Sequence, residues 1–125
     1  MLNIDSEQLK AYKRTARARH AARRGQDKPL RERAWALAQR AAQLLKADYG
    51  ATRVLLFGSL AQPDRFTHRS DIDIAAWGLT STNWLKAGST VRYLDQAHEF
   101  EINVVDTACA PSELLESIER YGVPL

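Results

Sequence analysis

The stretch that decides the fold reads FGSLA at residues 57–61, then a polar loop, then SDIDIA at residues 70–75. Residues two apart on a strand project to the same face, so Asp71 and Asp73 should point together while the isoleucines between and after them enter the core. Two carboxylates held this close repel each other unless a cation lies between them. A hard divalent ion such as Mg²⁺ prefers oxygen ligands and usually keeps waters and substrate phosphates as its other ligands. The pattern therefore predicts a metal site on a strand.

A phosphate site is expected beside it. Residues 52–57 form a nearly continuous apolar run that Gly58 stops, which is typical of a strand buried on both faces. Backbone N–H groups at Gly58-Ser59 could receive phosphate oxygens, and a glycine lets a phosphate approach closely. Alone, a Gly-Ser after a strand is more often an ordinary turn, and an Asp-x-Asp is more often a solvated strand end. Together, and in this order, they indicate phosphoryl or nucleotidyl transfer.

Before this stretch the sequence predicts two helices. The first starts at Asp5 or Ser6 and runs to Arg24, and the segment 25–29 breaks it with a glycine and a proline. The second runs from Pro29 or Leu30 to about residue 46. Its apolar positions recur at spacings of three and four, which gives one buried face: Leu30, Ala34, Leu37, Ala38, Ala41, Leu44 and Leu45.

After the stretch we expect three further elements: a helix at about 82–96, a strand at 100–105, and a closing helix that starts at Pro111 and stops at Gly122. With a strand at 71–77, helices and strands alternate along most of the chain. The fold class is therefore predicted to be α/β, a small mixed β-sheet flanked by helices, with an N-terminal helical extension.

Composition fits one globular domain, with 125 residues, 45% hydrophobic and 26% charged. No run approaches the roughly 18 apolar residues of a membrane span, and the first ten residues lack the pattern of a secretory signal. The single cysteine, Cys109, cannot form an internal disulfide, which fits a cytoplasmic location.

Charge is unevenly distributed. Residues 1–33 carry ten Lys/Arg and four Asp/Glu, a net of +6, whereas the remainder carries eight and eleven, a net of −3. We therefore expect a basic N-terminal helical arm at 1–33 and the main domain at 34–125. The arm has three readings: a solvated helix face, a surface that docks on an acidic partner protein, or a nucleic-acid contact. The last is the least favoured, because groove-reading or aromatic side chains are not evident.

The stretch FGSLAQPDRFTHRSDIDIAAWGL, residues 57–79, resembles the minimal nucleotidyltransferase (MNT) family of the polymerase-beta superfamily. The C-terminal SELLESIERYGVPL, residues 112–125, is similar to the family's closing helix and its glycine-bearing end. The resemblance extends from about Arg53 to Leu125 and implies a polymerase-beta-like nucleotidyltransferase fold.

The resemblance also implies roles for individual residues. Gly58 and Ser59 would hold the triphosphate of ATP, and Asp71 and Asp73 would be the Mg²⁺ ligands and catalytic carboxylates. Ser70 belongs to the same Ser-Asp-x-Asp motif. The preceding loop residue, Arg69, could contact the nucleotide or the acceptor, although a solvated polar loop is the alternative.

One position departs from the family pattern, which has a third acidic residue on the later strand. Asn103 occupies that place here, and Asn neither carries charge nor acts as a base. Glu101 lies two residues earlier on the same strand face and is the candidate substitute. Asp106 is less favoured, because it falls on the opposite face of a regular strand.

Many MNT proteins are antitoxins of HEPN-type ribonuclease toxins, and some transfer AMP to a toxin tyrosine. The resemblance thus implies an Mg²⁺- and ATP-dependent antitoxin that acts on a HEPN partner. A catalytically degenerate fold that neutralises its partner by binding alone is the alternative. Nucleotidylation of a small molecule is less favoured, because the chain has no room for a separate substrate-binding domain.

Overall fold

The computed structural model describes residues 6–62 and 64–125, with side chains described from residue 28 onward. Its elements, in chain order, are α1 (Ser6–Tyr49), β1 (Arg53–Phe57), a 3₁₀ turn (Ser59–Ala61), β2 (Ile72–Trp77), α2 (Ser81–Arg92), β3 (Ile102–Asp106), α3 (Ser112–Tyr121) and β4 (Val123–Pro124). Helices and strands alternate after α1, so the predicted α/β class with a mixed sheet is confirmed.

The strands of the described chain form one sheet in the order β3-β2-β1-β4. β1 pairs antiparallel with both β2 and β4, whereas β2 and β3 run parallel. Phe57 lies opposite Asp73, and Asp73 lies opposite Asn103. This register brings the end of β1, the start of β2 and the start of β3 to one place.

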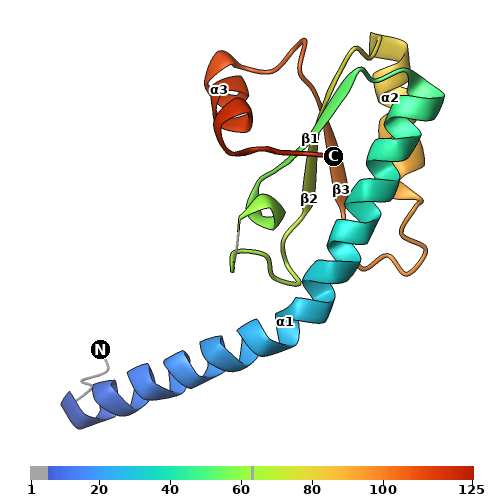
Figure 1. Ribbon diagram of the computed structural model, residues 1–125. Coiled ribbons are helices and arrows are strands. Elements are labelled where there is room, and N and C mark those ends of the chain that lie inside the picture. The colour runs from blue at the N-terminus through green and yellow to red at the C-terminus, as the bar shows by residue number, and fades with distance from the viewer. Residues whose placement is uncertain (1–5, 63) are drawn as a thin grey trace.

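The two faces of the sheet are covered unequally (Figure 1). On one face, α1 and α2 close a large core that includes Leu45, Leu56 and Ile72, each fully buried. On the other face, α3 covers a small cluster of Leu55, Ala75 and Ile118. The period of two explains the division, because neighbouring residues of one strand enter different clusters.

The predicted break at 25–29 is wrong, since α1 is one helix of 44 residues with Pro29 inside it. A proline removes one intrahelical hydrogen bond and crowds the carbonyl four residues earlier, so it often kinks a helix instead of ending it. Figure 1 shows the axis of α1 changing direction between its blue N-terminal part and its cyan C-terminal part. The packing of the second half of α1 against the core stabilises the helix and offsets the cost of Pro29.

That second half docks on the domain through the face that the apolar spacing predicts. Leu30, Ala34, Ala38, Ala41 and Leu45 are buried, while Leu37 and Leu44 are partly buried against the same core. Small alanines let the helix approach the sheet closely. The predicted first helix and most of the basic arm lie outside the residues whose side chains are described.

Most of the later elements follow the prediction, with two differences. α2 ends at Arg92, about four residues earlier than expected, and the buried carboxylate of Asp95 accepts a hydrogen bond of 2.7 Å from the Phe100 N–H in the turn that follows. β4 was not predicted, because a two-residue strand containing a proline has no sequence period to reveal it.

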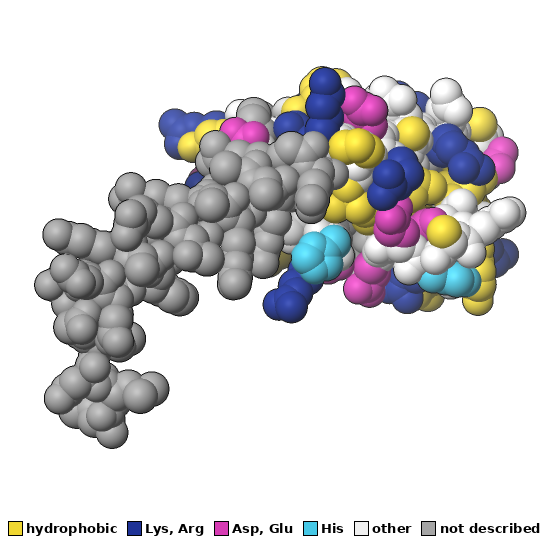
Figure 2. All heavy atoms as spheres, turned by 90° about the horizontal axis from the view of Figure 1, so that it is seen from below, with side chains coloured by type: hydrophobic (Ala, Val, Ile, Leu, Met, Phe, Trp, Pro, Cys, Tyr) yellow, Lys and Arg dark blue, Asp and Glu magenta, His cyan; other side chains and the backbone are white. Residues whose placement is uncertain are grey.

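The surface of the described domain is mixed in charge. Basic, acidic and apolar side chains alternate over the face in Figure 2. Two ion pairs join distant segments, Arg33 with Glu99 and Arg53 with Glu119. Among the described residues, no helix is long and apolar enough to cross a membrane.

Candidate nucleotidyl-transfer site

The Gly58 turn is shaped by its contact with a carboxylate. Gly58 has φ +74° and ψ −155°, a conformation that side chains with a Cβ rarely adopt. A Cβ at this position would collide with the Asp73 carboxylate, whose Cγ would lie at 3.2 Å. Only a glycine therefore lets the end of β1 pass directly beside Asp73.

After Gly58 the chain enters the 3₁₀ turn, and its middle residue fixes the turn to the core. Leu60 is fully buried, whereas Ser59 is half-buried. The Arg31 guanidinium of α1 donates to the Leu60 carbonyl at 3.4 Å. The Gly-Ser turn is thus held between α1 and the sheet, with Ser59 left partly open.

Two features organise the loop that leads to the aspartates. Phe66 is buried and packs on Phe100, with ring centroids 5.7 Å apart. Thr67 and Ser70 then form a tight turn, in which the Thr67 N–H donates to the Ser70 hydroxyl at 3.0 Å and the Ser70 N–H donates to the Thr67 carbonyl at 2.9 Å. This turn fixes the direction in which the chain enters β2, directly before Asp71.

Asp71, Asp73 and Asn103 meet at the start of β2 and β3. The Asn103 amide nitrogen donates to Asp71 Oδ2 and to Asp73 Oδ1, each at 3.4 Å. One amide group therefore bridges the two carboxylates. The structure places both aspartates on one side of the sheet, as the period of two predicts, while Ile72 and Ile74 are buried in the core.

Among Asp71, Asp73 and Asn103, the carboxyl group of Asp73 has a shifted pKa. Burial raises its pKa above the ordinary 3.8, the Asn103 hydrogen bond offsets part of this rise, and the charge of Asp71 adds to it. The folded protein thus disfavours the charged form of Asp73. A cation at the carboxylates would reverse that preference.

The donor set suits a divalent ion such as Mg²⁺. Asp71 and Asp73 provide hard carboxylate oxygens at one point, and Asn103 can turn its amide to present a carbonyl oxygen. Within the residues that the structure describes, no three His, Cys, Asp or Glu side chains come together to hold a metal. The site therefore provides two carboxylates and one amide.

The other residues proposed from the sequence lie around this centre. Glu101 is exposed immediately before β3, where its carbonyl accepts from the Ile72 N–H at 2.8 Å. The Ser70 hydroxyl is engaged in the turn with Thr67, and Arg69 is exposed on the same turn. Asp106 lies at the far end of β3, where its side chain accepts from the Ala108 N–H at 3.1 Å.

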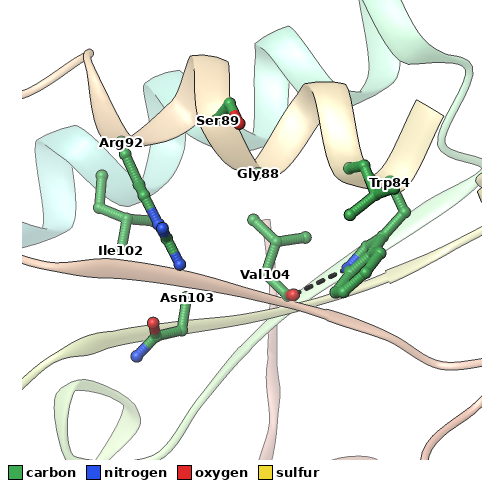
Figure 3. Close-up of a pocket in the computed structure, with 8 residues that line it drawn as sticks. Trp84, Gly88, Ser89, Arg92, Ile102, Asn103 and Val104 are labelled. Atoms are coloured by element: carbon green, nitrogen blue, oxygen red, sulfur yellow. Dashed lines mark hydrogen bonds between the residues drawn. The ribbon is translucent and has the colours of Figure 1, made fainter. Parts of the chain in front are cut away.

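Two features of the site were not anticipated from the sequence. The first is the bridge by Asn103, whose position was predicted but whose hydrogen bonds were not. The second is a cleft beside β3, lined by α2 residues and reaching Asn103 (Figure 3). Gly88, which lies within the predicted helix, is one of the α2 residues that line it.

A small mixed sheet that holds a Gly-Ser turn against paired aspartates is the arrangement of a nucleotidyltransferase-like fold. Comparison with solved structures shows which known proteins share this fold. The chain is similar to a toxin–antitoxin complex crystallised with AMP-PNP (TM-score 0.55, 23% identity, 70% of each chain covered). It is also similar to a variant of the toxin–antitoxin complex MntA–HpeT (TM-score 0.55, 25% identity, 70% of this chain and 69% of the other).

A third similar structure contains a tri-AMPylated HEPN toxin from Shewanella oneidensis with its MNT antitoxin (TM-score 0.53, 19% identity, 73% of this chain and 70% of the other). The nucleotidyltransferase-like fold and the resemblance to MNT antitoxins are thereby confirmed. No protein-family model matches the sequence, and no curated protein does so either.

Proposed function

We propose that this protein is an antitoxin of the nucleotidyltransferase type that transfers AMP from ATP to a tyrosine of a partner HEPN ribonuclease toxin. The observation that carries the proposal is the contact between the Gly58 turn and Asp73, beside Asp71. In this proposal the turn would bind the phosphates and the two aspartates would bind a divalent cation, so the contact supports two adjacent sites that nucleotidyl transfer needs. The similar structures, one with AMP-PNP and one with an AMPylated HEPN toxin, support it.

The reaction has a simple atom balance. The tyrosine oxygen forms a bond to the α-phosphorus, the bond from that phosphorus to the bridging oxygen breaks, and pyrophosphate leaves with that oxygen. The hydroxyl proton must go to a base or to water. When bound, Mg²⁺ supplies positive charge that neutralises the phosphate oxygens.

The chain's own residues have distinct tasks in this proposal. Asp71 and Asp73 hold the cation, and Gly58 lets the phosphates come close to them. Ser59, the half-buried first residue of the 3₁₀ turn, would bind a phosphate oxygen. Asn103 cannot take the proton, so Glu101, the exposed carboxylate immediately before β3, is the candidate base.

The test is the intact mass of a cognate HEPN toxin after incubation with this protein, ATP and Mg²⁺. We expect a gain of one or more AMP units, and we expect the double variant Asp71→Asn/Asp73→Asn to give none. Unchanged transfer by that variant would refute the mechanism. The exposed variant Gln96→Glu, outside the site, is the control and should transfer AMP normally.

A second function is favoured by the amide at position 103 and by the two-carboxylate donor set. In this alternative the fold is catalytically degenerate, and the protein neutralises its partner by binding alone. It predicts a stable complex with no mass gain, and protection of cells that survives the Asp71/Asp73 double variant. Loss of protection by that variant while the complex stays intact would exclude it.

A further inference from the structure

Arg31 is the only lysine or arginine within residues 28–62 and 64–125 that is partly buried, since all the others there are exposed. Arginine normally keeps its charged end in water, so partial burial of the group carries a desolvation cost. Arg33 and Arg53 pair with glutamates, whereas Arg31 forms no ion pair with any carboxylate of the described side chains. The positive charge of Arg31 is therefore partly withdrawn from water without a described anion to compensate it.

The fold directs this side chain to the turn after β1. Leu30 and Ala34, on either side of Arg31 in α1, are buried in the core and fix this part of the helix. The Arg31 Nη2 donates to the Leu60 carbonyl at 3.4 Å. That carbonyl belongs to the 3₁₀ turn that begins directly after Gly58. The guanidinium thus lies at the turn to which the proposed function assigns the phosphates.

Most of the hydrogen-bonding capacity of this guanidinium is unused by the described protein. A guanidinium has five N–H donors, and the bond to Leu60 is the one that Arg31 forms with the described residues. A length of 3.4 Å makes this bond a weak one. The planar fork of a guanidinium matches two oxygens of a phosphate group, and hydrogen bonds between charged groups are stronger than those between neutral groups. A phosphate group would use the remaining donors and neutralise the charge.

We propose that Arg31 binds the β- and γ-phosphates of the nucleoside triphosphate, which leave together as pyrophosphate. This inference rests on the proposed function, because it adds a phosphate-binding residue to the same site. The turn contacts Asp73 at Gly58 and Arg31 at Leu60, so it lies between the carboxylates and the guanidinium. With the α-phosphate at the cation, the two terminal phosphates extend along the turn toward Arg31.

Arg31 then contributes to the chemical step as well as to binding. When the bond from the α-phosphorus to the bridging oxygen breaks, its electron pair stays with the pyrophosphate, whose negative charge increases. A fixed positive charge at that end stabilises this charge as it develops and requires no proton transfer. Arg31 also lets the site distinguish ATP from AMP, since AMP has neither of the phosphates that Arg31 binds.

The test measures the affinity of the full chain for AMP-PNP, pyrophosphate and AMP in the presence of Mg²⁺, by isothermal titration calorimetry. Arg31→Gln keeps a donor for the Leu60 carbonyl but removes the charge. We expect it to weaken the binding of AMP-PNP and pyrophosphate at least about tenfold and to leave AMP binding unchanged. Its affinity for AMP-PNP should also depend less on salt concentration, because one ionic contact is lost.

Two matched variants complete the test. Arg31→Lys keeps the charge and should retain most of the affinity for AMP-PNP. Arg40→Gln removes the same charge from an exposed position of α1 and should bind all three ligands like the parent. An equal loss for Arg31→Gln and Arg31→Lys, with the salt dependence of the parent, would overturn the proposal, because Arg31 would then act only by holding the turn through Leu60.

Other outcomes separate this inference from the proposed function. Equal AMP-PNP affinity of the parent and Arg31→Gln, or no measurable binding of AMP-PNP and pyrophosphate by the parent, would overturn the role of Arg31. Weaker AMP-PNP binding by Arg31→Gln, without AMP transfer by the parent to the HEPN partner, would support the role of Arg31 and count against the transferase. AMP transfer by Arg31→Gln with the kcat/KM of the parent for ATP would refute the role of Arg31 and leave the transferase intact.

Discussion

Asn103→Asp is the most informative single change, because it exchanges an amide for a carboxylate of the same shape between two existing carboxylates. The amide nitrogen of Asn103 donates to Asp71 and to Asp73 at 3.4 Å each. The substitution removes both donations and adds a third negative charge. It also restores the acidic residue that the MNT pattern places at this position.

The cost in the absence of metal can be worked out from these contacts. Two long hydrogen bonds contribute about 0.5–1 kcal/mol each, so about 1–2 kcal/mol is lost. Repulsion at about 4 Å adds about 1 kcal/mol for each of two pairs in a water-like dielectric. The total is about 3–4 kcal/mol, which corresponds to a fall of roughly 10–15 °C in melting temperature for a chain of this size. The loss of stability cannot exceed the cost of protonating one of the three carboxyl groups, because a protonated carboxyl group no longer repels the other two.

Metal should reduce this difference in melting temperature, because a third carboxylate is a better ligand for a divalent cation than an amide. Each tenfold gain in affinity stabilises the folded state by about 1.4 kcal/mol at saturating metal. We therefore expect Asn103→Asp to melt well below the parent in EDTA and to gain more than the parent does on addition of Mg²⁺ or Mn²⁺.

The assay is a thermal melt in EDTA and across a series of Mg²⁺ and Mn²⁺ concentrations. Gln96→Glu adds the same charge at an exposed position and is the control, with no expected difference from the parent in either condition. An equal melting temperature for Asn103→Asp and the parent in EDTA would refute the argument that Asn103 neutralises the carboxylates. An equal response to metal would refute the assignment of Asn103 to the metal site.

Three further changes test other parts of the structure. Burial and the charge of Asp71 raise the pKa of Asp73, so the protonated carboxyl group favours folding, and this stabilisation is lost as pH rises from about 3.8 through the folded pKa. Asp73→Asn should therefore raise the melting temperature at neutral pH in EDTA and make it depend less on pH. A lower melting temperature for Asp73→Asn would contradict this argument. Gly58→Ala should cost about 1–3 kcal/mol of stability, because it strains a positive φ, and should abolish the thermal shift with ATP and Mg²⁺; an unchanged melt would show that the turn accepts a Cβ. Gly88→Ala, with open space at the added Cβ, should stabilise the protein by up to about 1 kcal/mol in denaturant unfolding, and a loss of stability would reveal a packing role.

The sequence predicts the structure correctly where one physical cause determines which residues are buried or share a face. The apolar spacing of the second half of α1 predicted its buried face, since burial alone selects those positions. The alternation around Asp71 and Asp73 predicted that both carboxylates share a face, because the period of a strand is two. The alternating order of elements in turn indicated the fold class.

Other features depend on partners that are distant in the sequence. Pro29 normally ends or kinks a helix, and no local signal states that packing beyond it sustains α1. β4 exists only because Val123 and Pro124 pair with Leu56 and Leu55 across the sheet. The donation from Asn103 to both aspartates requires the parallel register of β2 and β3, which the sequence does not encode locally.

The unequal covering of the two faces of the sheet has a consequence for cooperativity. The face under α1 and α2 holds most of the buried apolar side chains, whereas α3 is anchored mainly by Ile118 on Leu55 and Ala75. Segments with few buried contacts open at lower free energy than the global transition, and their amide protons exchange sooner. We therefore expect the amides of α3 to exchange through a sub-global opening while those of α1 beyond residue 30 stay protected. Asp73 and Ala75 lie on the same face of β2, and Ile118 of α3 packs against Ala75, so we expect this opening to uncover the part of that face next to Asp73 while the rest of the core remains folded.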